Sequence, residues 1–271
     1  MGKLVRFARF VHAGGVSFGV VEGEAGAGQG ALTIAEIGSL PFEEVRFTGQ
    51  RWALADVRLL APIFSSKVVG IGRNYAEHAA ELGNEVPKEP MLFIKPSTSV
   101  IGPNDAIRLP PVSQRVEEEA ELAVVIGATG ARRVDRAGAE KAIFGYTIGN
   151  DVTARDLQRK DPQWTRAKGF DSFCPIGPWI ETELDVRDLE IRCEVGRNPD
   201  AMEVRQIGRT KDLVFDIPTL VSYVSHVMTL LPGDIILTGT PAGVSELTAG
   251  DTCSITIQGI GELRNPVVSL E

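Results

Sequence analysis

The chain is poor in histidine, the residue on which many metal and acid–base sites depend. Only His12, His78 and His226 occur among its 271 residues, and they lie far apart in the sequence. A zinc site with several histidines would have to be assembled from distant segments. We therefore expect any metal site to be built from carboxylates, which select a hard cation such as Mg²⁺, Mn²⁺ or Ca²⁺.

Cysteine and long apolar runs are also scarce. The three cysteines, Cys174, Cys193 and Cys253, are odd in number and show no CxxC spacing, which is typical of a reduced intracellular chain. The first residues contain no apolar core long enough for a signal peptide, and no window reaches the ~18 apolar residues of a membrane span. These features predict a cytoplasmic protein.

Positive charge is in deficit. Lys and Arg number 28 against 36 Asp and Glu, which gives a formal net charge of −8. Nucleic acids and anionic membranes require a positive footprint, so the charge argues against both as partners. It does not exclude a small anionic substrate, because a bound cation can dominate the local field.

Short β-type runs dominate the sequence. Residues 1–62 alternate apolar and polar residues and include a Gly/Ala-rich loop, which predicts a small β-rich N-terminal unit ending near Pro62. Residues 63–271 would form the main domain. Its expected strands are residues 67–72, 91–95, 121–127, 144–150, 234–239 and 252–257. Because these runs do not alternate regularly with helices, we predict an α+β fold, predominantly β, and no doubly wound sheet.

Helical patterning is limited to three segments. Short helices are predicted within residues 74–83 and 152–159. A longer helix is predicted over 216–231, where Asp216 can cap the N-terminus and Pro218 suits the first turn. Its apolar residues recur at helical spacing: Leu220, Val221, Val224, Val227 and Leu231.

An acidic run leads directly into one of the apolar strands. Glu119 and Glu121 are two residues apart, so they project from the same face of a strand. Taken alone, such a run is typical of a solvated strand end. However, Glu121 adjoins a strand that reads as buried, and Asp151 ends another apolar strand. Three buried carboxylates from two strands favour a divalent metal, which would relieve their mutual repulsion.

Several further motifs accompany these carboxylates, in a fixed order. They are GRNYAEH (72–78), LFIKPST (92–98), EAELAVVIG (119–127), GYTIGNDVTARDLQ (145–158), QWTRAKGFDSFCPIGPW (163–179) and LTGTPAGV (237–244). Together they resemble the fumarylacetoacetate hydrolase family, over about residues 65 to 268. The resemblance implies a mixed β-roll like the C-terminal domain of that family, preceded by the small β-rich unit.

The resemblance also implies roles for individual residues. Glu119, Glu121 and Asp151 match the family's ligands for Mg²⁺ or Mn²⁺. One departure is Glu118, which stands where the family usually has an aromatic residue. It would add negative charge near the metal, and it leaves Glu117 with Glu119 as a competing pair of ligands. We keep Glu119 and Glu121, because the strand follows the second glutamate as the family pattern requires.

An acid–base pair is predicted in NYAEHAAELG. His78 and Glu81 are three residues apart and would share a helix face, so the carboxylate can orient the imidazole as a general base. The spacing alone fits a surface ion pair equally well. The resemblance favours a catalytic dyad on a lid that closes over the substrate, and an open lid would hold the dyad away from the metal.

Other motif positions resemble family residues beside the metal and the substrate. Lys168 matches a lysine that can stabilise an enolate oxygen. The predicted substrate contacts are Arg73, Tyr75, Lys95, Gln158 and Thr240.

The implied activity is that of a metal-dependent enzyme acting on a small 2-oxo or enol acid. Acylpyruvate hydrolysis, decarboxylation of oxaloacetate and isomerisation of 2-hydroxyhepta-2,4-diene-1,7-dioate all suit the site, and the sequence leaves them open. A non-catalytic metabolite-binding protein is the alternative, although His78, Glu81 and Lys168 argue against it. The resemblance further implies a homodimer.

Overall fold

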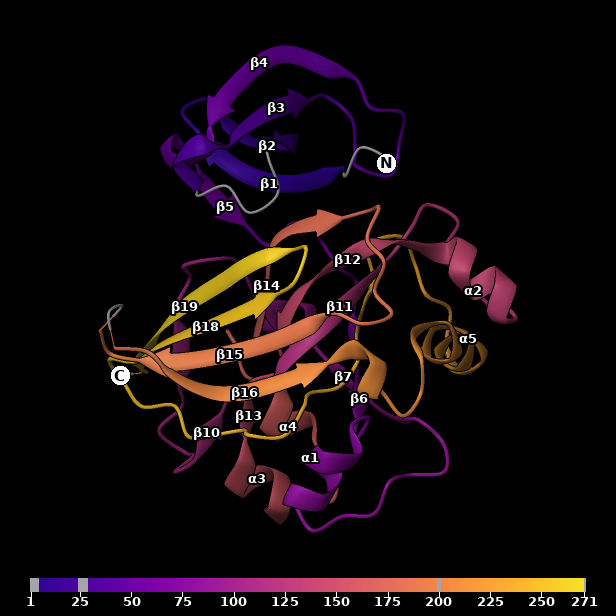
Figure 1. Cartoon of the computed structure of the whole chain (residues 1–271), viewed down its shortest axis with the longest axis vertical. Coiled ribbons are helices and arrows are strands. Elements are labelled where there is room, and N and C mark those ends of the chain that lie inside the picture. Colours follow the sequence, from indigo (N-terminus) through magenta and orange to yellow (C-terminus); the bar gives the residue numbers. More distant parts are fainter. Residues whose placement is uncertain (1–4, 24–28, 199–200, 271) are drawn as a thin grey trace.

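The structure, a computed structural model, describes residues 5–23, 29–198 and 201–270. Residues 24–28 of the expected Gly/Ala-rich loop lie outside these ranges. The chain forms a small β lobe on top of a larger, mostly β body (Figure 1). The predicted fold class, α+β and predominantly β, is confirmed.

The N-terminal lobe is an antiparallel meander with the strand order β4-β3-β2-β1. Alternation in β1 places Phe10 in one buried cluster and Phe7 in another, so both faces of this strand are covered. The elements of the lobe are β1 (Arg6–His12), β2 (Gly15–Glu22), η1 (Gln29–Ala31), β3 (Thr33–Ile37), β4 (Phe47–Ala53), η2 (Leu54–Asp56) and β5 (Arg58–Leu60).

The lobe and the body share one sheet. Strand β1 pairs antiparallel with β14 (Cys174–Glu181) of the body, where Arg6 lies opposite Glu181 and Phe7 opposite Ile180. From there the sheet continues in the order β14-β12-β11-β17-β6-β7. A second sheet, with the order β16-β15-β18-β19-β9, packs beside it.

The remaining strands belong to the body. They are β6 (Val68–Gly72), β7 (Met91–Lys95), β8 (Val100–Ile101), β9 (Ile107–Leu109), β10 (Val116–Glu117), β11 (Ala120–Ile126), β12 (Ile143–Asn150), β13 (Thr153–Ala154), β15 (Glu190–Gly196), β16 (Glu203–Arg209), β17 (Ile235–Leu237), β18 (Thr252–Ile257) and β19 (Gly261–Ser269).

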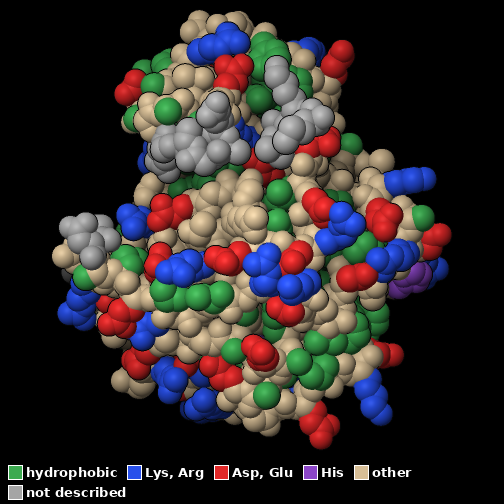
Figure 2. Space-filling model, in the orientation of Figure 1, with side chains coloured by type: hydrophobic (Ala, Val, Ile, Leu, Met, Phe, Trp, Pro, Cys, Tyr) green, Lys and Arg blue, Asp and Glu red, His purple; other side chains and the backbone are tan. Residues whose placement is uncertain are grey.

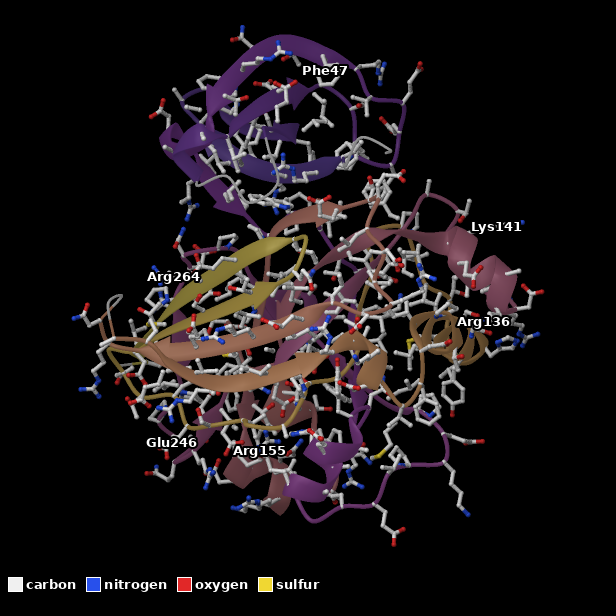
Figure 3. All side chains as sticks on the ribbon, in the orientation of Figure 1. Phe47, Arg136, Lys141, Arg155, Glu246 and Arg264 are labelled. Carbon is white, nitrogen blue, oxygen red and sulfur yellow. The ribbon has the colours of Figure 1, made fainter. Side chains whose placement is uncertain are left out.

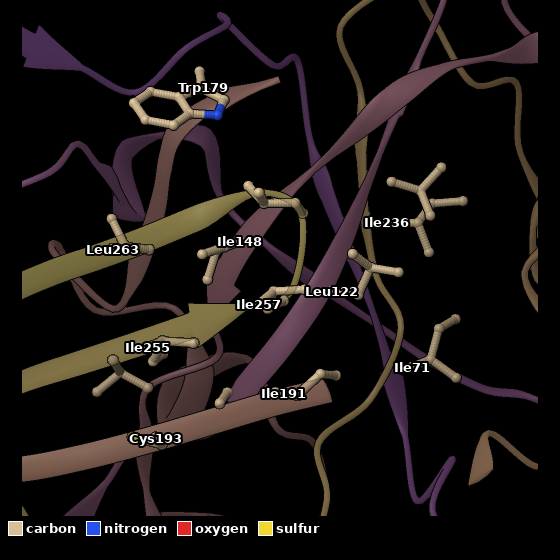
Figure 4. Close-up of a cluster of buried hydrophobic side chains, with 14 of the residues drawn as sticks. Ile71, Leu122, Ile148, Trp179, Ile191, Cys193, Ile236, Ile255, Ile257 and Leu263 are labelled. Atoms are coloured by element: carbon tan, nitrogen blue, oxygen red, sulfur yellow. The ribbon is translucent and has the colours of Figure 1, made fainter. Parts of the chain in front are cut away.

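The main core lies between the two sheets. Leu122 and Ile148, from β11 and β12, share a buried cluster with Ile255 and Ile257 of β18 (Figure 4). Every residue of β11 is buried, which explains why its sequence reads as an apolar run and not as an alternating strand. This rigid strand carries Glu121 at its start, so the core fixes the position of the acidic segment.

Five α-helices and two short 3₁₀ turns of the body lie outside the sheets in the described chain (Figure 1). They are α1 (Ala76–Glu81), η3 (Ser97–Ser99), α2 (Arg136–Ala142), α3 (Arg155–Lys160), α4 (Thr165–Lys168), η4 (Thr210–Asp212) and α5 (Ile217–Val227). None of the helices in these ranges is both long and apolar enough to cross a membrane.

Helix α5 corrects one prediction. Asp216 caps it by accepting a hydrogen bond from the Thr219 backbone amide, as expected, but the helix ends at Val227 and not at residue 231. The chain becomes extended so that Leu230 can exchange two backbone hydrogen bonds with Ala131. Leu230 is therefore buried, whereas Val227 and Leu231 are exposed. A local periodicity could not reveal this bridge to a distant segment.

Candidate active site

Three buried carboxylates converge at the start of β11 and the end of β12. One oxygen from each of Glu119, Glu121 and Asp151 lies within 4.8 Å of the other two. Pairing of β11 with β12 sets Glu121 opposite Gly149, and the Asp151 backbone amide donates to the Glu119 carbonyl at 2.9 Å. The antiparallel pairing of β11 with β12 thus holds Asp151 next to Glu119 and Glu121, which lie far from it in the sequence.

Three buried cations surround these carboxylates. Lys168 Nζ donates to Glu119 Oε2 at 2.8 Å and to Asp151 Oδ2 at 2.5 Å. Lys95 Nζ lies 2.6 Å from Asp151 Oδ1, on a different oxygen of the same carboxylate. Arg155 Nη2 donates to Glu119 Oε1 at 2.6 Å. Each exposes 2% of its surface or less, so the charges face each other with little screening by water.

Glu121 receives the least compensation of the three carboxylates. Its Oε2 accepts a hydrogen bond from the Gly239 amide at 2.6 Å, and no cation pairs with it among the described residues. Burial, together with repulsion from Asp151 and Glu119, raises its pKa well above the usual value. Burial would also raise the pKa of Glu119, but attraction to Lys168 and Arg155 outweighs it and lowers that pKa.

This donor set fits a hard divalent cation. Three clustered carboxylates supply oxygen ligands, the type that Mg²⁺ and Mn²⁺ prefer. A cation among them would also offset the repulsion that raises the pKa of Glu121. All three side chains also line the adjoining cavity, so a cation held by them would be within reach of a ligand there.

The neighbouring glutamates point elsewhere. Glu117 Oε1 accepts from Arg115 Nε at 2.5 Å and its Oε2 accepts from Arg155 Nε at 2.6 Å, so it is held as an ion pair outside the cluster. Glu118 Oε1 accepts from the amide and hydroxyl of Ser245, at 3.1 and 2.9 Å. Burial raises the pKa of Glu118 to about 8. This shift reduces the negative charge that the sequence leads one to expect at Glu118.

His78 lies at the same cavity and contacts Glu81. Helix α1 places His78 Nδ1 3.2 Å from Glu81 Oε2, and the Glu81 carboxylate also accepts from the Gly243 amide at 3.0 Å. His78 is 5% exposed and lines the cavity together with the carboxylates. The segment is thus closed over the site, and not held away from it as an open lid would be.

The cavity is small, with a volume of about 50 Å³. Arg73, Gln158 and Thr240, three of the predicted substrate contacts, line it together with Lys168. Two other predicted contacts do not. Lys95 is fully buried against Asp151, and Tyr75 is buried with no hydrogen-bond partner for its hydroxyl among the described residues.

Comparison with known proteins shows the family of the chain. Residues 67–268 match the family described as fumarylacetoacetate (FAA) hydrolase C-terminal, and residues 5–62 match the one described as Rv2993c-like, N-terminal. The chain belongs to the fumarylacetoacetate hydrolase family. It is therefore an enzyme of that family, as its motifs indicate.

Relatives share most of the chain. Protein Rv2993c of Mycobacterium tuberculosis is 52% identical over 267 residues, which cover 97% of this chain and 98% of that protein. A 5-carboxymethyl-2-hydroxymuconate delta-isomerase from Mycobacterium smegmatis is 52% identical, with a TM-score of 0.88 over 98% of this chain and 100% of that chain. A fumarylpyruvate hydrolase from Pseudomonas aeruginosa, in complex with Mn²⁺ and pyruvate, is 32% identical, with a TM-score of 0.70 over 79% of this chain and 92% of that chain.

Two residues that support this family site were not found from the sequence. The Asn150 side-chain oxygen accepts from the Glu119 amide at 3.0 Å. Gln206, fully buried on β16, accepts from the Ala120 amide at 2.9 Å and donates to Thr240 Oγ1 at 2.7 Å. Asn150 could have been suspected because it precedes Asp151 directly. Gln206 lies in an otherwise ordinary strand, and only the tertiary fold shows its role.

Arg155 has a larger role than the sequence indicated. Its guanidinium reaches Glu117 and Glu119 and also donates to Gln158 Oε1 at 2.7 Å. It projects from the start of α3 at the base of the body (Figure 3). Because the Gln158 oxygen is occupied, its amide nitrogen remains as the donor for a ligand in the cavity.

Proposed function

We propose that this enzyme binds Mg²⁺, or Mn²⁺, through Glu119, Glu121 and Asp151 and transforms a small 2-oxo acid by way of an enolate. The observation that carries the proposal is the meeting of these carboxylates with Lys168 and His78 at one cavity. The P. aeruginosa hydrolase, which holds Mn²⁺ and pyruvate, supports both the kind of metal and the kind of ligand.

The cation, when bound, would supply positive charge for the carboxylate and the adjacent oxygen of a 2-oxo acid. The residues of the chain would then orient the rest of the molecule. Gln158 offers its amide nitrogen to the cavity, since Arg155 occupies its oxygen. Thr240 Oγ1 accepts from Gln206, so its hydroxyl proton is free to be donated to the substrate.

Lys168 would stabilise the charge that develops on the enolate oxygen. Burial by itself would lower the pKa of Lys168, but attraction to Asp151 and Glu119 outweighs it and raises the pKa. These contacts favour the ammonium form of the side chain. A fixed ammonium in a site shielded from water is an effective electrostatic partner for a developing anion.

His78 would move the proton. Its Nδ1 lies against Glu81, which leaves Nε2 as the nitrogen that can exchange a proton with a substrate carbon or with water. Glu81 is itself held by the Gly243 amide, so its contact with Nδ1 fixes the orientation of the imidazole. This arrangement suits a general base whose tautomer is set by a carboxylate.

Three reactions share these groups: isomerisation of a 2-hydroxy-diene-dioate, hydrolysis of an acylpyruvate and decarboxylation of oxaloacetate. The M. smegmatis relative favours isomerisation, and the P. aeruginosa relative favours hydrolysis. We place the isomerisation first, because that relative shares 52% of its residues and the whole two-lobed chain.

The test is a panel of these substrate classes, each incubated with Mg²⁺ or Mn²⁺, with EDTA, and with EDTA followed by excess Mg²⁺. A change in enol absorbance without cleavage reports isomerisation, release of a second carboxylic acid reports hydrolysis, and release of CO₂ reports decarboxylation. We expect turnover of at least one class, its loss in EDTA and its recovery with Mg²⁺. Turnover that persists in EDTA would contradict the metal, and tight oxalate binding without any turnover would contradict the proposed chemistry.

We also expect a homodimer, on the grounds of the family resemblance. Light scattering at micromolar concentration should give about twice the chain mass of 29.2 kDa. A monomeric mass would contradict this expectation and leave the metal and acid–base proposals unaffected.

A further inference from the structure

Glu117 is a buried carboxylate that takes no part in the proposed chemistry. It exposes 1% of its surface, whereas Glu246, which lies opposite it in an isolated β-bridge, is exposed. Two arginines contact it: Arg155 Nε donates to Oε2 at 2.6 Å, and Arg115 Nε donates to Oε1 at 2.5 Å. A buried carboxylate is costly unless it is paired, so these two contacts hold Glu117 in place.

The two arginines differ in what else they reach. The Arg115 side chain is half exposed and, among the described residues, makes only this one ion pair. Arg155 is buried and uses all three nitrogens of its guanidinium as donors. Nε donates to Glu117, Nη1 to Gln158 Oε1 at 2.7 Å and Nη2 to Glu119 Oε1 at 2.6 Å. Arg155 therefore connects Glu117 to the carboxylate cluster and to the cavity.

The shape of the guanidinium gives this connection a direction. The group is planar, so the direction of one N–H bond largely fixes the directions of the others. The contact of Glu117 with Nε therefore sets the plane in which Nη1 meets Gln158 and Nη2 meets Glu119. If Glu117 were absent, Nε would be a buried donor without an acceptor, and the guanidinium would turn further onto Glu119.

The Glu117 side chain is not needed to bring the two segments together. Strand β10 pairs antiparallel with β13, which places Glu117 opposite Thr153. The Arg155 amide also donates to the Arg115 carbonyl at 2.8 Å. Because backbone hydrogen bonds already join the segments, the ion pair between Glu117 and Arg155 serves to orient the guanidinium.

We infer that Glu117 is a positioning residue, which orients Arg155 and through it fixes the proposed metal ligand Glu119 and the amide of Gln158. The inference rests on the proposed function for the metal. While Glu117 shares Arg155, the guanidinium cannot pair with Glu119 alone. Without Glu117 it would do so, and it would compete with the cation for that carboxylate.

The first test is calorimetric titration of Mg²⁺ into the wild-type protein and two variants at position 117. Glu117→Leu removes the acceptor and should weaken Mg²⁺ binding by about 10–100-fold, as for other residues that orient metal ligands. Glu117→Gln keeps an acceptor for Arg155 Nε, so it should bind Mg²⁺ at least about threefold more tightly than Glu117→Leu does. Equal losses in the two variants would show that only the charge matters, and would overturn the inference.

Two matched controls separate this route from a general effect of charge. Glu246→Leu makes the same substitution at the exposed glutamate across the β-bridge, which Figure 3 labels. Arg115→Met removes the other partner of Glu117 and leaves Arg155 in place. Both should weaken Mg²⁺ binding by no more than about twofold, because their side chains are largely solvated. A loss in Arg115→Met as large as that in Glu117→Leu would contradict the route through Arg155.

A second test needs no metal. In EDTA, the buried Arg155 Nε–H should give a slowly exchanging signal in ¹H–¹⁵N NMR spectra, identified by its absence from Arg155→Lys. The signal should persist in Arg115→Met and Glu246→Leu. It should be shifted or lost in Glu117→Leu, since its acceptor is gone.

Two results would overturn the inference. One is an Arg155 Nε–H signal that is the same in Glu117→Leu as in the wild type, and the other is unchanged Mg²⁺ affinity in that variant. A wild-type protein that fails to bind Mg²⁺, but whose signal depends on Glu117, would contradict the proposed metal and leave the orientation of Arg155 by Glu117 supported.

Discussion

The lobe and the body of this protein differ most in how they treat charge. In the N-terminal lobe, Arg6 is the buried charged side chain among the described residues, and β4 exposes nearly all of its residues. The body buries the acidic cluster, its cations and His78. All residues that line the inner cavity come from the body. Burial of charge thus marks the part of the molecule that does chemistry. On the face seen in Figure 2, surface charges of both signs are interspersed.

The junction between the two regions holds a different kind of buried charge. Glu181 of β14 is fully buried opposite Arg6, and its Oε1 lies 3.7 Å from Arg6 Nε. Neither of its carboxylate oxygens accepts a well-formed hydrogen bond from a described residue. At the active site, cations and amides contact the carboxylates at 2.5–3.0 Å. Glu181 thus lacks the short contacts that compensate the buried carboxylates of the active site.

The largest effect should come from Glu121→Gln. The change removes a ligand oxygen but keeps an acceptor for the Gly239 amide, so the fold should be retained. Activity should fall more than about 100-fold, and calorimetry should show weaker Mg²⁺ binding. When both proteins are measured in EDTA, the melting temperature of Glu121→Gln should not be lower than that of the wild type. The reason is that the substitution replaces a buried carboxylate that has no paired cation by a neutral amide. The adjacent control, Glu118→Gln, should lose little activity, and equal losses in both variants would contradict the assignment.

Lys168→Met should separate catalysis from metal binding. Loss of the ammonium should lower kcat by about 10²–10³-fold, as expected for one electrostatic partner of a developing anion. Mg²⁺ affinity should be retained or increased, because a cation that contacts Glu119 and Asp151 has been removed. Steady-state kinetics and calorimetry provide the two measurements. Lys160→Met, an exposed lysine on α3, is the control and should behave as the wild type.

Gln206→Leu tests the support behind the site. The variant loses the hydrogen bonds to Ala120 and Thr240, which connect the acidic segment to the loop after β17. Activity or metal affinity should fall by about 10–100-fold, as for other residues that orient metal ligands. Arg205→Met changes an exposed neighbour on the same strand and should have little effect. Similar losses in both variants would point to a general weakening of β16.

The smallest effect should be at the junction. Burial raises the pKa of Glu181 to about 7, although Arg6 opposes the shift. The folded state therefore favours the protonated form, and the stability that this form contributes is lost as pH rises from about 4.5 through about 7. Glu181→Gln should be more stable than the wild type by about 1–3 kcal/mol at pH 8, with most of the difference gone near pH 5. Thermal melts at both pH values measure this, and a difference independent of pH would contradict it. Activity should be unchanged.

Much of the fold could be predicted from local patterns. The strands at residues 67–72, 91–95 and 252–257 follow from short apolar runs, and Asp216 marks the start of α5. The end of α5 could not be predicted, because the partner of Leu230 is Ala131, about a hundred residues earlier in the chain. Local sequence indicates where an element can begin, but long-range pairing decides where it ends.

The candidate site shows the same division. Spacing on a strand brings Glu119 and Glu121 to one face, and the motifs single out Asp151, His78 and Lys168. The pattern could not show that Lys95 lies behind Asp151, or that Glu117 is held by Arg155, because those contacts join segments about 40 to 60 residues apart. It also could not show the state of Glu118, which depends on burial against Ser245.

The sequence by itself determined the chemistry available to this protein: carboxylates for a hard cation, one histidine with a carboxylate partner, one lysine, and the family to which they belong. Only the tertiary structure decided how those groups are charged and what they can reach. Burial and ion pairing shift the protonation of Glu118, Glu119 and Glu121 in different directions although they are near neighbours in the chain. The physical reason is that a charge responds to the groups around it in space and to its access to water, and both are set by pairing between distant strands.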